Sequence, residues 1–220
     1  IRLPPRSTPL YSSAASDVYK SQDTYIVERC GVGEEARAKA LQLIEDGCEL
    51  LIGWGVAGGA EPNLRNGDLV VTSDFKNELD LEFHFDSNLA EMIDRKLHEL
   101  KPRSGPILTV KTMVLKPEEK KLLADKYRIS VLDMESTIIA QVAEKAAIPY
   151  LCIRAICDEL DTDIPLFVNE SLNKIGDPAL CTLLYNLLRD PSQLISMIKL
   201  GWKFRIALNT LRDTARLLTK

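Results

Sequence analysis

Histidine is scarce in this chain of 220 residues, which contains only His84 and His98. Two histidines alone do not complete a zinc site, so the sequence predicts no metal and no bound cofactor. The cysteines are odd in number, lack C-x-x-C spacing and lie mostly in apolar runs, which indicates reduced core thiols in a reducing compartment. We therefore predict a cytoplasmic protein. The five cysteines are Cys30, Cys48, Cys152, Cys157 and Cys181.

Long apolar runs are also missing. No run approaches the roughly 20 residues that span a bilayer, which argues against an integral membrane protein. The net charge of −4 argues against general binding of nucleic acid. A charged fraction of 27% and a hydrophobic fraction of 45% are typical of a soluble protein, and the length suits one α/β domain with a sizeable core.

The first 22 residues lack the periodicity of the rest of the chain. They contain no continuous apolar segment, so they do not form a signal peptide. Residues 10–22 resemble the translation of a sequencing-library adapter, and a disordered native tail is the alternative. We predict a non-native or disordered tail over 1–22, an α/β domain over 23–190 and a helical extension of the same domain over 191–220.

Strand-like and helix-like segments alternate after this tail. Predicted strands cover 25–29, 50–54, 69–72, 106–110, 130–132 and 150–156. Predicted helices cover 34–45, 88–100, 117–126, 135–146 and 178–188, and 192–219 forms one long helix or two short ones. This alternation predicts a three-layer α/β fold with a mixed, mostly parallel twisted sheet, helices on both faces and extra amphipathic helices at the C-terminus.

Two carboxylates follow two of the predicted strands. Asp158 comes after an apolar run, where ligands of open α/β sheets bind, and a carboxyl at an apolar mouth can carry a proton to a leaving base. Glu135 can accept hydrogen bonds from two ribose hydroxyls and stabilise an oxocarbenium-like sugar. A helix N-cap for Asp158 and helix-dipole stabilisation by Glu135 are the structural alternatives. Together, the two carboxylates point to cleavage of an N-glycosidic bond.

Two further charged residues are predicted to support this pair. Asp133 precedes the same helix as Glu135 and could equally stabilise its dipole. Arg154 lies inside a predicted strand, and a buried arginine needs an anionic partner. We expect Arg154 to hold either Glu135 or the loop at Asp158.

Glycines follow the first two predicted strands. Gly31 and Gly33 lie at a strand-to-helix turn that resembles a shortened phosphate loop. The glycines within residues 55–59 predict a second turn, which suits the close approach of a ligand.

Five segments in this order resemble the nucleoside phosphorylase and nucleosidase superfamily. That superfamily includes purine nucleoside phosphorylase, methylthioadenosine/adenosylhomocysteine nucleosidase and futalosine hydrolase. The five segments are Cys30–Gly33, Gly55–Gly59, Gly67–Val71, Asp133–Ser136 and Arg154–Asp158. The resemblance covers about residues 25–190. The basic, apolar segment after it looks most like the hopanoid-associated phosphorylase branch, also described as adenosylhopane nucleosidase.

The resemblance implies a role for residues of these motifs. Asp158 matches the acid that protonates the purine at N7, Glu135 matches the ligand of the ribose hydroxyls, and Met134 packs on the sugar. The turn at residues 55–59 lies under the ribose and base, and residues 109–114 form the edge against adenine. The implied substrate-binding positions are Ala57, Gly58, Met113, Val114, Met134 and Glu135.

Two departures from the family pattern bear on the acceptor. Phosphorylases usually offer a hydroxyl to phosphate at the position of Val56, so its apolar side chain favours water over phosphate, although phosphate stays a candidate co-substrate. Nucleosidases carry a glutamate after their first strand to activate water. Residues 1–22 contain no glutamate, so we expect this chain to lack that base.

The C-terminal segment allows two interpretations. Its apolar face and basic residues suit a lipid chain or peripheral contact with a membrane. Alternatively, it is an amphipathic helix that closes the domain or forms a dimer interface. The resemblance implies a homodimer.

The predicted activity is release of adenine from a 5′-substituted adenosine, with adenosylhopane of hopanoid lipid biosynthesis as the leading substrate. Alternatives are a methylthioadenosine/adenosylhomocysteine nucleosidase, a futalosine hydrolase-like enzyme, or a truncated nucleoside-binding protein without turnover.

Overall fold

The structure is a computed structural model that describes residues 16–21, 24–165, 168 and 193–219. Its strands are β1 (Ser16–Ser21), β2 (Thr24–Arg29), β3 (Leu51–Gly59), β4 (Leu69–Thr72), β5 (Asp74–Asn77), β6 (Glu82–His84), β7 (Ile107–Thr109), β8 (Val131–Asp133) and β9 (Tyr150–Asp158). Its helices are α1 (Glu34–Glu45), α2 (Ser87–Lys96), the 3₁₀ turn η1 (His98–Leu100), α3 (Pro117–Tyr127), α4 (Ser136–Ala146) and α7 (Gln193–Leu218). The helix predicted over 178–188 lies outside the described residues.

The strands form one mixed sheet. Along its main path the order is β2-β1-β3-β8-β7-β5-β6, and β9 pairs with both β3 and β4. The pairs β3–β9, β5–β7 and β7–β8 are parallel, whereas β3–β8 and β4–β9 are antiparallel. The C-terminal ends of β7, β8 and β9 therefore gather near the end of β3, where both predicted carboxylates lie.

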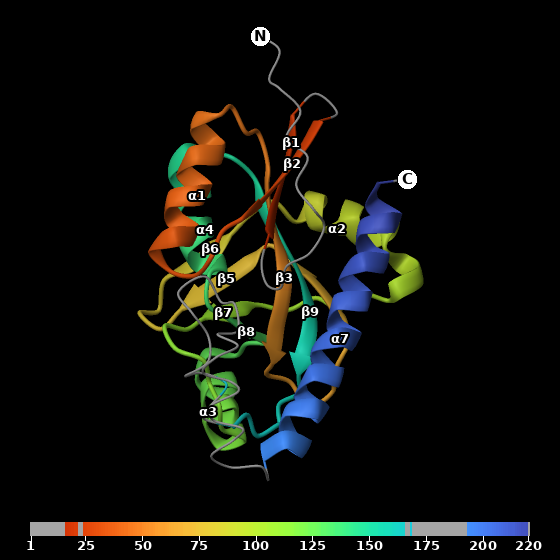
Figure 1. Cartoon of the computed structure of the whole chain (residues 1–220). Coiled ribbons are helices and arrows are strands. Elements are labelled where there is room, and N and C mark those ends of the chain that lie inside the picture. Colours follow the sequence, from red (N-terminus) through yellow and green to blue (C-terminus); the bar gives the residue numbers. More distant parts are fainter. Residues whose placement is uncertain (1–15, 22–23, 166–167, 169–192, 220) are drawn as a thin grey trace.

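Helices cover both faces of this sheet (Figure 1). Alternate residues of β9 face opposite sides, as a strand requires. Tyr150 and Cys152 pack in the cluster that contains α1 and α4, whereas Leu151 and Ile153 pack in the cluster that contains α2 and the end of α7. The near-continuous burial of β9 thus comes from two separate hydrophobic layers.

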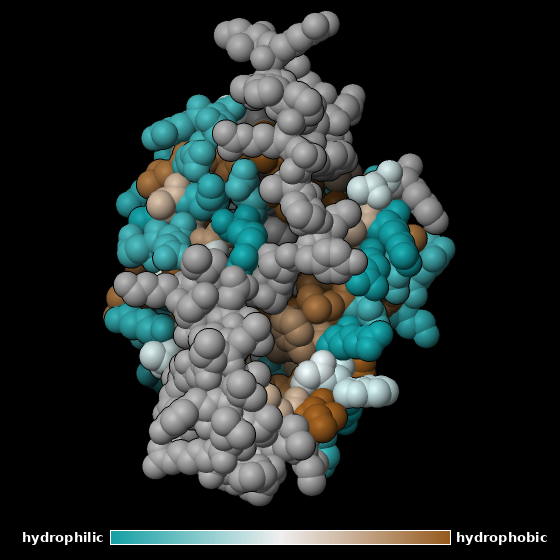
Figure 2. Space-filling model, in the orientation of Figure 1, coloured by the Kyte–Doolittle hydropathy of each residue, from teal (hydrophilic) through white to brown (hydrophobic). Residues whose placement is uncertain are grey.

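The long helix α7 crosses the sheet over β3 and β9. Ala207 and Leu211 pack against Ala155, together with the partly buried Trp54 and Val56. In Figure 2, hydrophobic residues gather where β9 and α7 lie, within a largely hydrophilic described surface. The C-terminal segment is thus one helix that covers the sheet, as the closing-helix interpretation requires.

Exposed apolar side chains lie on the same helix at helical spacing. Ile198, Trp202 and Ile206 have exposed fractions of 54%, 70% and 43%. Within the described residues, the helices are all too short or too polar to cross a membrane. Peripheral membrane contact and homodimer formation stay predictions.

Three features of the sheet differ from the sequence prediction. Residues 55–59, expected as a turn, continue β3 to Gly59, because β8 and β9 pair with this stretch on both sides. The short strands β5 and β6 were not predicted. Strand β1 lies within the segment expected to be a tail and pairs with β2 and β3. The boundary and non-native character of residues 1–22 stay predictions.

Candidate active site

Asp158 is the last residue of β9, at a bulge in its pairing with β3. The register shifts between Ala57 and Gly58, so that Gly58 lies opposite Asp158. A Cβ on Gly58 would lie 3.2 Å from Oδ2 of Asp158 and 3.4 Å from Oδ1. Glycine at this position therefore leaves room for the carboxylate, which is 6% exposed.

The cation beside Asp158 is Lys120, which the sequence analysis did not identify. Lys120 lies in α3 and is 1% exposed. Its Nζ donates a hydrogen bond to Oδ2 of Asp158 and forms an ion pair with it. The same Nζ lies 3.1 Å from the carbonyl of Glu159 and 3.5 Å from that of Thr162. One ammonium thus contacts both the carboxylate and the loop that follows it.

The other oxygen of Asp158 contacts a thiol. Cys157 Sγ donates to Oδ1 of Asp158 at 3.2 Å and lies 3.4 Å from the carbonyl of Ala57. Burial, and then the negative charge of Asp158, raise the pKa of the Cys157 thiol well above its ordinary value. Cys157 therefore stays a thiol that donates to the carboxylate.

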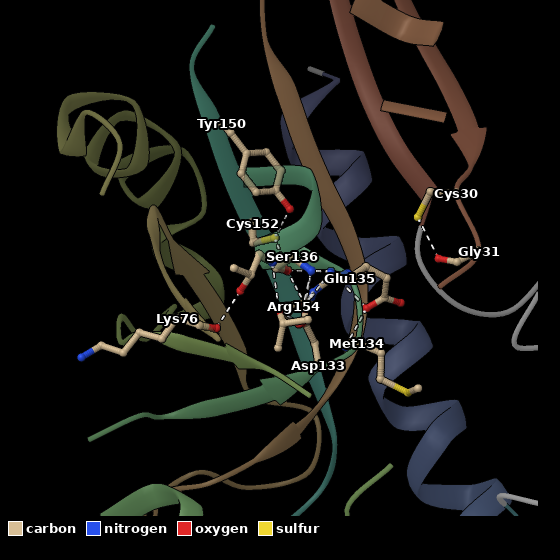
Figure 3. A network of polar contacts seen from close by, with 12 residues as sticks. Cys30, Gly31, Lys76, Asp133, Met134, Glu135, Ser136, Tyr150, Cys152 and Arg154 are labelled. Carbon is tan, nitrogen blue, oxygen red and sulfur yellow. Dashed lines mark hydrogen bonds and ion pairs between the residues drawn. The ribbon is translucent and has the colours of Figure 1, made fainter. Parts of the chain in front are cut away.

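Asp133 lies at the centre of a second buried network, between β8 and β9 (Figure 3). Oδ2 of Asp133 accepts from Nη2 of Arg154 at 2.8 Å and from Nε at 3.2 Å. Oδ1 accepts from Oγ1 of Thr109 at 2.8 Å, and both carboxylate oxygens lie 3.3 Å from the backbone N of Ser136. The Ser136 hydroxyl also donates to Oδ2 of Asp133. Asp133 thus joins β7, β9 and the start of α4.

Two neighbours on β9 extend this network. Cys152 Sγ lies 2.9 Å from Oγ of Ser136 and 3.0 Å from the hydroxyl of Tyr150. Burial raises the pKa of Cys152 to about 11, which keeps it a thiol near neutral pH. Burial opposes the charge of Arg154, but the negative charges of the Asp133 and Glu135 carboxylates, with that of Cys152 once it ionises at high pH, outweigh it and raise the pKa of the guanidinium well above its ordinary value.

Glu135 lies at the N-terminus of α4, immediately after this network. Its side chain is 10% exposed, and Oε2 lies 3.7 Å from Nη2 of Arg154. Oε2 also accepts from the backbone N of Met134 at 3.0 Å. The expectation for Arg154 was therefore incomplete. Arg154 does approach Glu135, but its shortest contacts are with Asp133. Asp133 ends β8, which lies on the other side of β3 from the strand of Arg154.

The predicted acid, Asp158, and the predicted ribose ligand, Glu135, follow pairings on opposite sides of β3. Gly58 pairs with Asp158 on one side and with Leu132 of β8 on the other. Two neighbouring strand spacings separate β9 from β8, which amounts to roughly 10 Å. Glu135 follows Leu132 by three residues, so the carboxylates flank a common edge of the sheet.

The remaining predicted binding residues lie in different surroundings. Val114 is 7% exposed and lies in a hydrophobic cluster against which Met134 packs, while Met113 beside it is half-buried. Ala57 is buried within β3 rather than in a turn. Val114, expected near adenine, and Met134, expected on the sugar, thus share one apolar cluster, whereas Ala57 belongs to another.

Gly31 and Gly33 form the predicted strand-to-helix turn. Their φ angles are 65° and 61°, a left-handed conformation that favours glycine, and Gly33 is the N-cap of α1. A cavity of about 350 Å³ lies at this turn and is lined by Arg29, Cys30, Gly31, Glu35 and Lys39. A second cavity of about 330 Å³ is lined partly by Glu159, Thr162 and Lys203, beside the loop that follows Asp158.

The family of this chain follows from its match to a family profile. The family profile described as "Phosphorylase superfamily" matches residues 5–177. The chain belongs to the phosphorylase superfamily. The match confirms the predicted superfamily and, with it, the assignment of the chain to a family of enzymes. It begins inside the segment predicted to be non-native.

The chain is also similar to curated nucleosidases. The 5′-methylthioadenosine/S-adenosylhomocysteine nucleosidase of Tolumonas auensis is 27% identical over 169 residues, covering 67% of this chain and 74% of that protein. The enzyme of the same name from Shewanella loihica is 27% identical over 173 residues, covering 69% and 75%.

Solved structures confirm the α/β fold. The Campylobacter jejuni nucleosidase of that name has a TM-score of 0.60 at 20% identity, covering 70% of this chain and 76% of its own. Futalosine hydrolase of Helicobacter pylori has a TM-score of 0.61 at 15% identity, covering 87% and 78%. The narrower resemblance to the hopanoid-associated branch of the superfamily stays a prediction.

Proposed function

We propose that this chain cleaves the N-glycosidic bond of a 5′-substituted adenosine and releases adenine. The observation that carries the proposal is the position of Asp158 and Glu135 on either side of the end of β3. One carboxylate can then act on the base while the other acts on the sugar. Membership of the phosphorylase superfamily supports the same chemistry.

In the proposed mechanism, Asp158 protonates N7 of the purine as the bond between N9 and C1′ breaks. Glu135 accepts hydrogen bonds from the ribose hydroxyls and stabilises the positive charge that develops on the sugar. Met134 and Val114 supply the apolar surface for the sugar and base, since both belong to one hydrophobic region. Met113 and Ala57 complete this proposed substrate site.

Methylthioadenosine and adenosylhomocysteine are the first substrates to test. They appear in the names of the curated relatives that match at 25–27% identity. Futalosine is the next, and adenosylhopane stays the more specific prediction from the sequence. Water is the favoured acceptor, because Val56 offers no hydroxyl to phosphate and packs beside α7.

The proposal is tested by adenine release from each nucleoside, measured by liquid chromatography. We expect the Asp158→Asn variant to lose about 10²–10⁴-fold in kcat, the range typical of general acid catalysis. Asp161→Asn is the matched control, because Asp161 is exposed in the same loop. Equal rates of adenine release in the two variants would contradict the assignment of Asp158 as the acid.

Binding of adenine without release from any of the nucleosides would instead support a nucleoside-binding protein.

Replacement of Glu135 by Gln tests the role of the second carboxylate independently of Asp158. Since Glu135 acts on the ribose, its removal is expected to weaken turnover of ribosides more than binding of free adenine. A uniform loss of both would contradict the proposed role of Glu135.

A further inference from the structure

Lys120 directs its whole ammonium group toward one short segment. A lysine ammonium carries three protons, and Nζ of Lys120 has three acceptors within 3.5 Å: the Asp158 carboxylate and the carbonyls of Glu159 and Thr162. All three lie at the end of β9 or in the loop that follows it. The hydrogen-bonding capacity of Lys120 is therefore used entirely at the proposed acid and the loop that follows it.

The burial of Lys120 is unusual for its side-chain type. Lysine is almost never fully buried unless it is paired, because removal of its charge from water is costly. Lys120 and Tyr127 are the buried residues of α3, so Lys120 lies on the inward face of this helix. A buried ion pair is often no more stabilising than apolar residues of similar size. Stability alone therefore does not account for a lysine at this position.

A second lysine holds the same loop from outside. Nζ of Lys203, in α7, lies 2.9 Å from Oε2 of Glu159 and 2.8 Å from Oγ1 of Thr162. The loop at residues 158–162 is thus clamped between α3 and α7. Because Lys203 keeps its contacts, the loop retains an anchor when the side chain of Lys120 is changed.

Resting on the function proposed above, we propose that Lys120 is a positioning residue that orients Asp158 and replenishes its proton. Lys120 passes one proton to Oδ2 of Asp158, and Asp158 passes one proton to N7 of the purine. The electrons of the C1′–N9 bond leave with adenine. Water then adds to C1′ and releases one proton to solvent, and Lys120 recovers one proton from solvent, so the protons balance.

Other titratable groups face this pair from neighbouring elements. Cys157 donates to Oδ1 of Asp158 from the same strand, and Glu159 with Lys203 forms the nearest ion pair from the side of α7. Cys157 stays protonated because its pKa is raised, and the charges of Glu159 and Lys203 offset one another. A change in the alkaline limb of the pH profile on removal of Lys120 is therefore assigned to the pair of Lys120 and Asp158.

The test compares Lys120→Met, Asp158→Asn and the double variant in the full chain. The unbranched Met side chain is one atom shorter than that of lysine and replaces its ammonium with an uncharged, apolar end. We expect kcat for adenine release to fall about 10–100-fold in Lys120→Met, below the full contribution of the acid itself, with KM changed by less than about threefold. The alkaline limb of the kcat profile should move to lower pH, because Asp158 then depends on solvent for its proton.

The control and the double variant separate this role from a structural one. Lys121→Met removes the same charge from the exposed neighbouring position and should leave kcat unchanged. In the Asp158→Asn background, Lys120→Met should cause no further loss, since Lys120 acts only through Asp158. A multiplicative loss in the double variant, or an unshifted pH profile, overturns the proposal.

Three further outcomes distinguish failure of the Lys120 proposal from failure of the proposed function. If Lys120→Met does not fold, the double variant still tests the proposal, because it leaves no unpaired buried charge and is compared with Asp158→Asn alone. If Lys120→Met releases adenine as fast as Lys121→Met, only the role of Lys120 fails. If the unmodified chain releases no adenine from any tested nucleoside, the proposed function fails, and the role of Lys120 fails with it.

Discussion

Two of the buried pairs of a carboxylate and a cation in the described part of the chain, Asp133 with Arg154 and Asp158 with Lys120, have different surroundings. In the first pair, Asp133 accepts from the guanidinium of Arg154 and also from Thr109 and Ser136. In the second, the described residues that donate to the carboxylate of Asp158 are Lys120 and Cys157. Asp133 is surrounded by donors, whereas Asp158 has fewer and lies at the end of its strand.

This difference separates a carboxylate that holds the fold from one that is suited to react. A carboxylate offers about four acceptor positions, and the donors around Asp133 use them. Asp133 therefore has little capacity left for a substrate. Asp158 retains acceptor capacity, and its main donor is a lysine, whose proton can move, rather than an arginine, whose proton does not.

Replacement of Arg154 by Met should have the largest effect on stability. The variant leaves the Asp133 carboxylate buried without its cation, which typically costs about 3–5 kcal/mol in the free energy of unfolding. Urea denaturation measures that loss. In the control Arg216→Met, the ion pair with Asp213 is exposed, so the loss should stay below about 1 kcal/mol. Similar losses in the two variants would contradict a structural role for the first pair.

Gly53→Ala should disturb the same network by overpacking. Its Cβ would lie 2.5 Å from Sγ of Cys152, which contacts Ser136, and 2.6 Å from the hydroxyl of Tyr150, which contacts Cys152. We expect a loss of about 1–3 kcal/mol in the free energy of unfolding, measured by urea denaturation. Gly201→Ala is the control, since its Cβ meets open space in α7 and should stabilise the helix by about 0.5–1 kcal/mol. A neutral Gly53→Ala variant would show that the network tolerates displacement.

The sequence predicted one of these pairs better than the other. Arg154 belongs to a strongly apolar strand, so its burial and its need for an anionic partner followed from the pattern. The expected partner was Glu135 or the loop at Asp158, whereas its shortest contacts are with Asp133. Lys120 lies in the charged run 116–121, which is typical of a solvated helix face. Only the packing of α3 against the loop after β9 buries this one lysine of the run, and helical periodicity alone carries no information about that loop.

A similar limit applies to β3. Glycines in residues 55–59 predict a turn from local preference, but pairing with β8 and β9 holds this segment as a strand. The glycines serve another purpose, since neighbouring side chains approach the backbone closely at Gly53 and Gly58. Strands β5 and β6 are short and carry charged residues, so alternation was too weak to identify them. Long-range pairing overrides local preference in both cases.

Gly58→Ala should reduce activity more than stability. Its Cβ would lie 3.2 Å from Oδ2 of Asp158, so the carboxylate must shift by a few tenths of an ångström. If the proposed function holds, we expect kcat for adenine release to fall about 10-fold, since small misplacements of a catalytic group are costly. The free energy of unfolding should change by less than about 1 kcal/mol. A stability loss as large as that of Gly53→Ala, without loss of kcat, would erase the proposed distinction between the two pairs.

The smallest expected effect concerns the outer clamp of the loop, the ion pair of Lys203 and Glu159. The hydrogen bond from Lys203 lowers the pKa of Glu159 below its ordinary value of 4.5, so the pair stabilises the fold above pH 4.5 and loses this contribution as pH falls through the lowered pKa. Lys203→Met should therefore cost about 0.2–1 kcal/mol near pH 7 and less at pH 3, measured by urea denaturation at both pH values.

Lys199→Met is the matched control for this clamp, because Lys199 is exposed one helical turn earlier in α7. It should show no such pH-dependent difference from the unmodified chain. If Lys203→Met instead abolished adenine release while Lys120→Met did not, the outer lysine rather than the buried one would control Asp158. The reactive pair would then be Asp158 with Lys203 of α7, rather than Asp158 with Lys120 of α3.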